Sequence, residues 1–197
     1  MNYLGHAYFS PDNDEILAGN VFGDFIKGKI ENIKLPENIK YGLRLHRKLD
    51  KVCNQCEGYY LIKETIGKDY GHFNGVIADI FIDHFLSVYW ENFSNISLEI
   101  FAESTYNKIE KSRKYFPKRF EKIFSYMKND NWFIRNRVLK NIENILKRIE
   151  KYSENGILLQ TSVNDIKVNP LLYKEYFYKF MNEMREDINN ELIVDKS

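Results

Sequence analysis

The sequence predicts an all-α fold, a single-domain helical bundle formed by residues 1–197. Apolar residues recur with helical spacing along most of the chain, and no segment alternates with the period of two that is typical of a strand. The segment 79–90 is apolar on nearly every side if it is helical, as expected for a helix at the centre of a domain. With 44% hydrophobic and 15% aromatic residues, the chain is long enough to bury a core of its own.

The expected helices follow from turn and cap residues. The turn cluster at 10–14 precedes the first long helix, Pro36 begins the second, and Gly67 ends a short one. Gly19 and Gly23 lie one turn apart on the first of these and would allow a close helix approach. The helices expected in the first half are 14–26, closed by Gly28, then Pro36 to before Gly58, 59–66, and the one containing 79–90.

The second half stays helical in its pattern. Its expected helices are 98–115, 117–127, 130–152 and 170–188, with a turn at 153–156. The last helix has an apolar stripe with i, i+3, i+4 spacing that we interpret as core packing and not as a cofactor site. The stripe is formed by Tyr173, Tyr176, Phe177, Phe180, Met181 and Met184.

Some functional classes are disfavoured by composition. The first ten residues lack the features of a signal peptide, and no window of about eighteen residues is apolar and uncharged, so we expect a cytoplasmic protein with no membrane partner. Cys53 and Cys56 are the only cysteines, which gives no disulfide framework and half of a four-cysteine zinc site. They continue a helix instead of starting one, so we expect two ordinary thiols.

Three pairs of polar residues are spaced four apart within apolar helices. Asp79 and Asp83, with His84 beside them, form the first pair. His46 and Asp50 form the second, and Asn20 and Asp24 the third. Each pair would project from one face of its helix. Imidazole nitrogen and carboxylate oxygen suit Mn²⁺, Fe²⁺, Zn²⁺ or Mg²⁺, so a divalent metal site built from several helices is predicted.

A purely structural interpretation stands beside the metal site. Buried carboxylates need a cation, and Asp79 or Asp83 could pair with Arg44 or Arg47. His72, in a loop bracketed by glycines, is expected to be exposed.

The net charge of +1 hides a basic segment. Residues 108–151 contain 14 Lys or Arg and five Asp or Glu. An acidic partner could bind there, or the charges could be the solvated faces of amphipathic helices. Nucleic acid is not expected as a partner, because the stacking aromatics of a known RNA-binding module are missing.

Four segments together resemble the acyl carrier protein phosphodiesterase family. They are MNYLGH at 1–6, AGNVFGDF at 18–25, HRKLD at 46–50 and DIFIDHFL at 79–86, with weaker similarity in NWF at 131–133 and YFYKF at 176–180. Gly5 and Gly23 depart from the alanine-like residues expected there, at positions not expected to affect the chemistry. The family is a divergent relative of the HD phosphohydrolases, all-helical and dependent on a divalent metal, with Mn²⁺ favoured. Here the adjacent pair is Asp83-His84, the reverse of the usual His-Asp order.

The resemblance implies an activity and a set of site residues. The activity is hydrolysis of the phosphodiester between 4′-phosphopantetheine and a serine of holo-acyl carrier protein, a step in lipid metabolism. Arg47 is the expected phosphate clamp. The expected metal ligands are His6, Asp24, His46, Asp83 and His84, with Asp50 and Asp79 as alternates or water-orienting carboxylates. Catalytic roles are expected for Asp24, Arg47, Asp50 and Asp79, and substrate contacts for Asn20 and Arg47. The basic segment at 108–151 adds four candidate contacts to an acidic carrier protein, namely Arg113, Lys118, Arg119 and Lys122.

Two alternative functions remain open from the sequence. The chain could be an HD-type hydrolase of a nucleotide or another small phosphoester, since no nucleotide-binding glycine motif is required for that. It could also be a helical domain that binds carrier protein without cleaving it. A panel of substrates distinguishes a hydrolase of small phosphoesters from a carrier-protein phosphodiesterase. Binding of carrier protein that needs no metal and gives no product would identify the non-catalytic domain.

Overall fold

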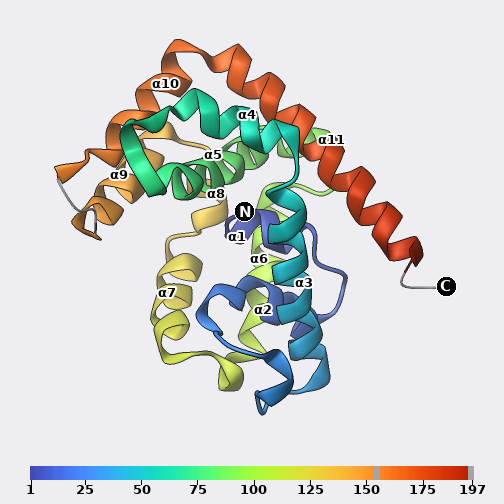
Figure 1. Cartoon of the computed structure of the whole chain (residues 1–197). Helices are drawn as coiled ribbons and strands as arrows, with labels where there is room; N and C mark the ends of the chain where they lie inside the picture. The colour runs from blue at the N-terminus through green and yellow to red at the C-terminus, as the bar shows by residue number, and fades with distance from the viewer. Residues whose placement is uncertain (153–155, 195–197) are drawn as a thin grey trace. The chain divides into compact units, whose positions relative to one another are not determined.

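The computed structural model describes residues 1–152 and 156–194, and every regular element in these ranges is a helix (Figure 1). The prediction of an all-α fold is therefore confirmed. The chain divides into two compact units: unit 1 comprises Met1, 50–85 and 138–197, and unit 2 comprises 2–49 and 86–137. Two of the four divisions fall inside helices, one between Leu49 and Asp50 in α3 (Glu37–Cys53) and one between Phe85 and Leu86 in α5 (Asn74–Val88). The turn predicted at 153–156 lies, apart from Gly156, outside the described residues.

Unit 2 is built around α2, which contacts α1 and α6. An aromatic cluster of Phe22, Phe116, Phe120 and Phe124 forms part of its core, with ring centroids 4.9 to 6.0 Å apart. Besides most of α3 and the end of α5, its helices are α1 (Tyr3–Tyr8), α2 (Asp14–Val21), η1 (Gly23–Phe25), η2 (Ile30–Asn32), η4 (Trp90–Asn92), α6 (Leu98–Glu110), η5 (Arg113–Tyr115), α7 (Lys118–Asn129) and α8 (Trp132–Arg135).

The predicted close approach at Gly19 is confirmed. A Cβ atom at Gly19 would lie 2.3 Å from the carbonyl oxygen of Ile39, and one at Gly42 would lie 2.2 Å from the carbonyl oxygen of Ile16. Only residues without a side chain permit this contact between α2 and α3. The contact sets the spacing of the two helices that carry Asn20 and His46.

The helix predicted over 14–26 is wrong beyond Val21. The α2 helix ends there, and Asp24 lies on the separate 3₁₀ turn η1. The cause is a long-range contact: the carbonyl oxygen of Asn20, which a continuing helix would use for the amide of Asp24, accepts a hydrogen bond from Nδ1 of His46 at 2.8 Å. Asn20 and Asp24 are therefore not one turn apart on a single helix.

Unit 1 contains an adjacent pair of helices, α4 and α11, that lie side by side (Figure 1). Gly58 of α4 makes this possible, since a Cβ atom there would lie 2.4 Å from the backbone nitrogen of Phe180. Glu183 of α11 accepts from the amide of Gly58 at 3.0 Å and so satisfies one free amide at the start of α4. The remaining helices are α4 (Glu57–Ile66), η3 (Lys68–Phe73), α9 (Leu139–Ile149), η6 (Glu150–Tyr152), η8 (Leu159–Ser162), α10 (Val163–Val168) and α11 (Pro170–Val194).

The core helices were predicted correctly and some connections were not. Helix α5 buries residues on nearly every side, and five of the six members of the α11 stripe are fully buried, with Tyr176 partly exposed. The predicted helices 98–115 and 130–152 are each interrupted, the second by the extended backbone of Val138. Helix α10 was not predicted. None of the described helices combines the length and apolar composition needed to cross a membrane.

Candidate metal centre and carboxylate cluster

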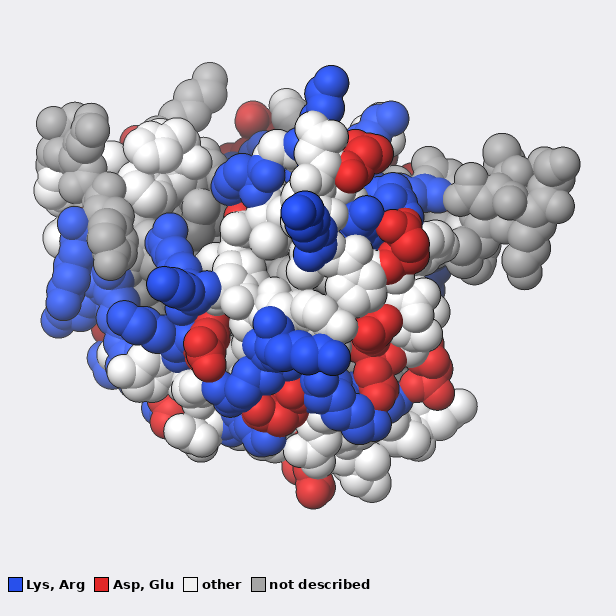
Figure 2. All heavy atoms as spheres, turned by 90° about the horizontal axis from the view of Figure 1, so that it is seen from below, with Lys and Arg blue, Asp and Glu red and all other residues white. Residues whose placement is uncertain are grey.

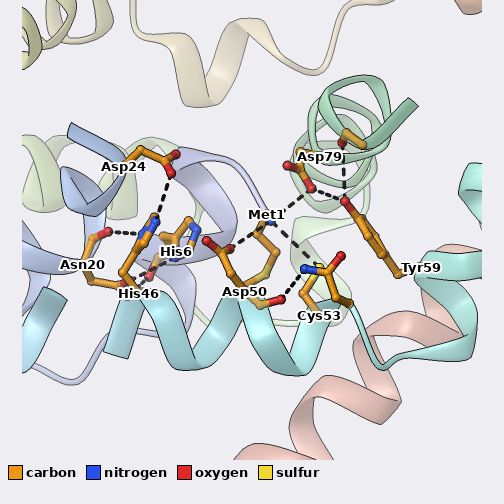
Figure 3. Close-up of polar contacts among 11 residues, drawn as sticks. Met1, His6, Asn20, Asp24, His46, Asp50, Cys53, Tyr59 and Asp79 are labelled. Carbon is orange, nitrogen blue, oxygen red and sulfur yellow. Dashed lines mark hydrogen bonds and ion pairs between the residues drawn. The ribbon is translucent and has the colours of Figure 1, made fainter. Parts of the chain in front are cut away.

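Four residues of unit 2 that the sequence singled out lie together, and we call them the histidine cluster (Figure 3). Helix α1 provides His6, α2 provides Asn20, η1 provides Asp24 and α3 provides His46. The rings of His6 and His46 stack with centroids 4.1 Å apart and planes at 21°. Both rings and Asn20 are buried, whereas the side chain of Asp24 is 68% exposed. The cluster thus has a buried nitrogen side and an open carboxylate.

Asn20 accepts a hydrogen bond from Nδ1 of both imidazoles. Its Nδ2 donates to the carbonyl oxygen of His6 and to Oγ of Ser10, each at 2.8 Å, so its Oδ1 is the acceptor for Nδ1 of His6 at 3.0 Å. Its backbone carbonyl accepts from Nδ1 of His46. In the neutral form of each ring, a hydrogen bond from Nδ1 to an oxygen leaves the lone pair on Nε2, which is the arrangement of metal-bound histidine.

The open side of the cluster is formed by His46 and Asp24. Nε2 of His46 lies 3.3 Å from Oδ1 of Asp24. Gly23 brings Asp24 to this position, since a Cβ atom at Gly23 would lie 2.3 Å from Cγ of His46. Any larger residue at position 23 would therefore meet the ring of His46.

The histidine cluster of unit 2 offers two imidazoles, those of His6 and His46, and the carboxylate of Asp24 as candidate ligands of a metal ion. Asp50 follows His46 by one turn of α3, as the spacing of four predicted. Two imidazole nitrogens and a carboxylate oxygen form a donor set that fits Mn²⁺, Fe²⁺ or Zn²⁺.

A second group of polar residues lies within unit 1, and we call it the carboxylate cluster (Figure 3). The amino group of Met1 lies 3.0 Å from Oδ1 of Asp79, 3.4 Å from Oδ1 of Asp50 and 3.9 Å from Sγ of Cys53. The hydroxyl of Tyr59 donates to Oδ1 of Asp79 at 2.9 Å. The structural interpretation of the sequence had proposed Arg44 or Arg47 as the cation. The cation beside Asp79 is instead the Met1 amino group.

Burial and charge act in opposite directions on the Met1 amino group. Burial lowers its pKa, but Asp79, Cys53 and Asp50 outweigh this and raise the pKa to about 12. The group is therefore charged at neutral pH. Sequence reasoning missed both Met1 and Tyr59, because an α-amino group belongs to no side-chain pattern and a tyrosine in an apolar helix looks like core.

The other predicted ligands and the phosphate clamp have the following places. Asp83 and His84 lie on α5 and are 1% and 4% exposed. Arg47 is exposed on α3, and its Nη2 donates to the carbonyl oxygen of Gly28 at 2.8 Å. Arg47 therefore reaches the loop that follows Asp24, within unit 2.

The basic residues predicted to bind substrate differ in their surroundings. Arg113 forms ion pairs with Glu110 and, at 3.2 Å, with Glu121, so its charge is compensated within the fold. Lys118, Arg119 and Lys122 are exposed on α7, and we call them the α7 basic face. The ring of Phe25, next to Asp24, lies 5.3 Å from that of Phe120 on α7. The α7 helix thus supports the turn that carries Asp24.

The two cysteines are buried free thiols. Burial raises the pKa of each to about 12. A protonated, buried thiol is a poor nucleophile and a poor metal ligand. This agrees with the interpretation of Cys53 and Cys56 as ordinary thiols.

Comparison with known proteins gives a consistent result. The family model described as acyl carrier protein phosphodiesterase matches residues 1–184. A protein of Photorhabdus laumondii with that name is 27% identical over 97% of this chain and 96% of its own length. A protein of Pectobacterium atrosepticum with the same name is 24% identical over 94% of this chain and 96% of its own length. One of Yersinia enterocolitica is 27% identical over 98% of this chain and 100% of its own length. No solved structure matches the chain.

Proposed function

Because the chain belongs to the acyl carrier protein phosphodiesterase family, we propose that it hydrolyses the phosphodiester of holo-acyl carrier protein. The products are apo-carrier protein and free 4′-phosphopantetheine. The observation that carries the proposal is the family match over 1–184, which includes every residue of the histidine and carboxylate clusters. Because the match spans both units, we propose that they work as one functional domain. We further propose that this domain is related to the HD phosphohydrolases and acts in the cytoplasm, in lipid metabolism.

The proposed reaction depends on a divalent metal, with Mn²⁺ as the favoured ion. His6 and His46 would hold it through Nε2, since their Nδ1 atoms are engaged by Asn20. Asp24 lies beside His46 and is a third candidate ligand, and Asp50, Asp83 and His84 are the other ligands that we propose from the family resemblance. A divalent ion supplies positive charge to the phosphoryl oxygens and lowers the pKa of bound water.

The chain's own groups account for the remaining steps. Arg47 can form paired hydrogen bonds to two phosphate oxygens, which an ammonium cannot do. Its contact with Gly28 places the guanidinium beside the loop that follows Asp24. Asp79 is partly exposed and can take a proton from the attacking water. In this proposal Arg47 binds the phosphate of the substrate, and Asp79 accepts a proton from the attacking water.

The proposed docking surface for the acidic carrier protein is the α7 basic face. It is exposed, no ion pair compensates its charges within the described ranges, and α7 packs against the turn of Asp24. Arg113 is left out of this surface because Glu110 and Glu121 neutralise it. Lys and Arg spread over much of the face in Figure 2, with Asp and Glu among them.

The experiment that tests the function compares substrates. Purified protein is incubated with holo-carrier protein, with bis(p-nitrophenyl) phosphate and with a panel of nucleotides, and products are identified by mass spectrometry. The proposal requires conversion of holo-carrier protein to the apo form. Hydrolysis of nucleotides alone would instead establish a small-phosphoester hydrolase, and binding without product would establish a non-catalytic carrier-protein-binding domain.

A further inference from the structure

The Asp79 carboxylate is held by two groups to which no role has been assigned. We propose that the Tyr59 hydroxyl and the Met1 amino group are positioning groups that orient Asp79 as the proton acceptor of the reaction. This inference rests on the proposed function, because it assigns the base of that hydrolysis. Both groups act through Asp79 and neither needs to touch the substrate.

The two contacts converge on one oxygen atom. Tyr59 donates to Oδ1 of Asp79 at 2.9 Å, and the Met1 amino group lies 3.0 Å from the same atom. In the part of the chain that the structure describes, no hydrogen bond or ion pair is found for Oδ2 of Asp79. Two donors on one oxygen fix the plane of the carboxylate and leave the lone pairs of the other oxygen to accept a proton.

Exposure distinguishes Asp79 from a carboxylate with a purely structural role. Its side chain is 29% exposed, whereas that of Asp83, one turn further along α5, is almost completely buried. The Met1 amino group and the Tyr59 side chain are both buried in the protein interior. The donors are thus inside the fold and the carboxylate is open to water.

The Tyr59 hydroxyl is itself held in place as a donor. The residue is 5% exposed on α4, its ring lies 6.2 Å from that of Phe180, and the ammonium of Lys63 lies 5.3 Å from its centroid. Burial raises the pKa of Tyr59 above its usual value, so the hydroxyl keeps its proton. A side chain packed in this way loses little further entropy in orienting its partner.

The proton balance of the step is complete. The water oxygen forms a bond to phosphorus while the bond from phosphorus to the serine oxygen breaks. One water proton passes to Oδ2 of Asp79, and the other stays on the new phosphate oxygen. The serine oxygen takes a proton from solvent, and Asp79 returns its proton to solvent after product release.

Tyr59→Phe removes only the hydroxyl, and the adjacent, 58% exposed Tyr60 provides a matched control, Tyr60→Phe. Steady-state rates on bis(p-nitrophenyl) phosphate are measured well below the melting temperature of both variants. We expect Tyr59→Phe to lower kcat about tenfold or more with KM changed less than about twofold, as for a group needed mainly in the transition state. Tyr60→Phe should match the wild type. A folded Tyr59→Phe protein with wild-type kcat overturns the proposal.

A second measurement does not need activity. The carboxyl carbon of Asp79 is observed by ¹³C NMR in the wild type, in both tyrosine variants, and in a chain whose Met1 amino group is converted to an amide by one added glycine. Tyr59→Phe and the glycine extension should shift this resonance, and Tyr60→Phe should not. If the wild type cleaves no phosphodiester, the proposed function fails while this spectrum still reports the contacts. An unchanged Asp79 resonance in Tyr59→Phe overturns the positioning role.

Discussion

The close approach of α2 and α3 at Gly42 gives the sharpest test of how the fold builds the site. A Cβ atom at Gly42 would lie 2.2 Å from the carbonyl oxygen of Ile16, 2.8 Å from the nitrogen of Asn20 and 2.9 Å from Cα of Gly19. All three are backbone atoms, so no side chain can rotate away. Ordinary contact begins at 3.4 Å, so Gly42→Ala must move the helices apart locally by 1.2 Å, the difference between 3.4 and 2.2 Å.

Two opposing effects set the change in stability. Alanine favours a helix over glycine by about 1 kcal/mol, and overpacking costs about 1–3 kcal/mol. The net loss is up to about 2 kcal/mol, or about 4–8 °C in Tm for a chain of this length. The effect on activity is larger, because His46 lies one turn from Gly42 and must keep its bond to Asn20. A misplacement of about 1 Å costs about 10²-fold in rate.

The assay combines calorimetric Tm with kcat on bis(p-nitrophenyl) phosphate, and Gly75→Ala is the control. Gly75 is also helical, but a Cβ atom there has only the Tyr59 hydroxyl within 4 Å, at 3.7 Å. Gly75→Ala should therefore raise Tm, because alanine has a higher helix propensity than glycine and no packing cost opposes it. The reasoning is refuted if Gly42→Ala also raises Tm and keeps wild-type kcat.

Three further predictions concern charge. Arg47→Lys should lower activity on the small diester about tenfold or more, because an ammonium cannot form the paired bonds of a guanidinium; wild-type rates would contradict the clamp. Lys118→Glu with Lys122→Glu should lower kcat/KM for holo-carrier protein in a salt-dependent way and spare the small diester, unlike the control Lys147→Glu with Arg148→Glu. Equal effects on both substrates would exclude docking on α7. Stability should fall as pH rises from 8 toward 12 in urea titrations, because the folded pKa of the Met1 amino group, about 12, exceeds its ordinary 8.0; a constant free energy of unfolding over this range would contradict a paired amino group.

Local patterns in the sequence predicted the helices that carry the core. Helical periodicity predicts which residues of a helix face its neighbours. It predicted the buried apolar residues of α5, the apolar stripe on α11 and the close helix contact at Gly19. The end of α2 at Val21 could not be predicted, because it depends on His46, which is 26 residues away from the carbonyl oxygen it engages. Periodicity alone favoured continuing that helix through Asp24.

The candidate site was predicted in part for the same reason. The spacing of four between His46 and Asp50 is local, and both residues lie on the continuous helix α3 as predicted. The contacts of Tyr59 and the Met1 amino group with Asp79 join segments that are 20 and 78 residues apart in sequence, and no spacing rule connects them. Only the packing of α4 and α5 with the start of the chain reveals the carboxylate cluster.

The most direct test of the account is the mass of holo-carrier protein after incubation with metal-free protein, with Mn²⁺-reconstituted protein and with reconstituted His46→Ala. We predict that reconstituted wild type removes 4′-phosphopantetheine completely, that metal-free protein leaves the mass unchanged, and that His46→Ala stays folded but binds Mn²⁺ weakly and gives little product. Complete conversion by metal-free protein, or an unchanged mass with the Mn²⁺-loaded wild type, would contradict a metal-dependent phosphodiesterase built on the histidine cluster.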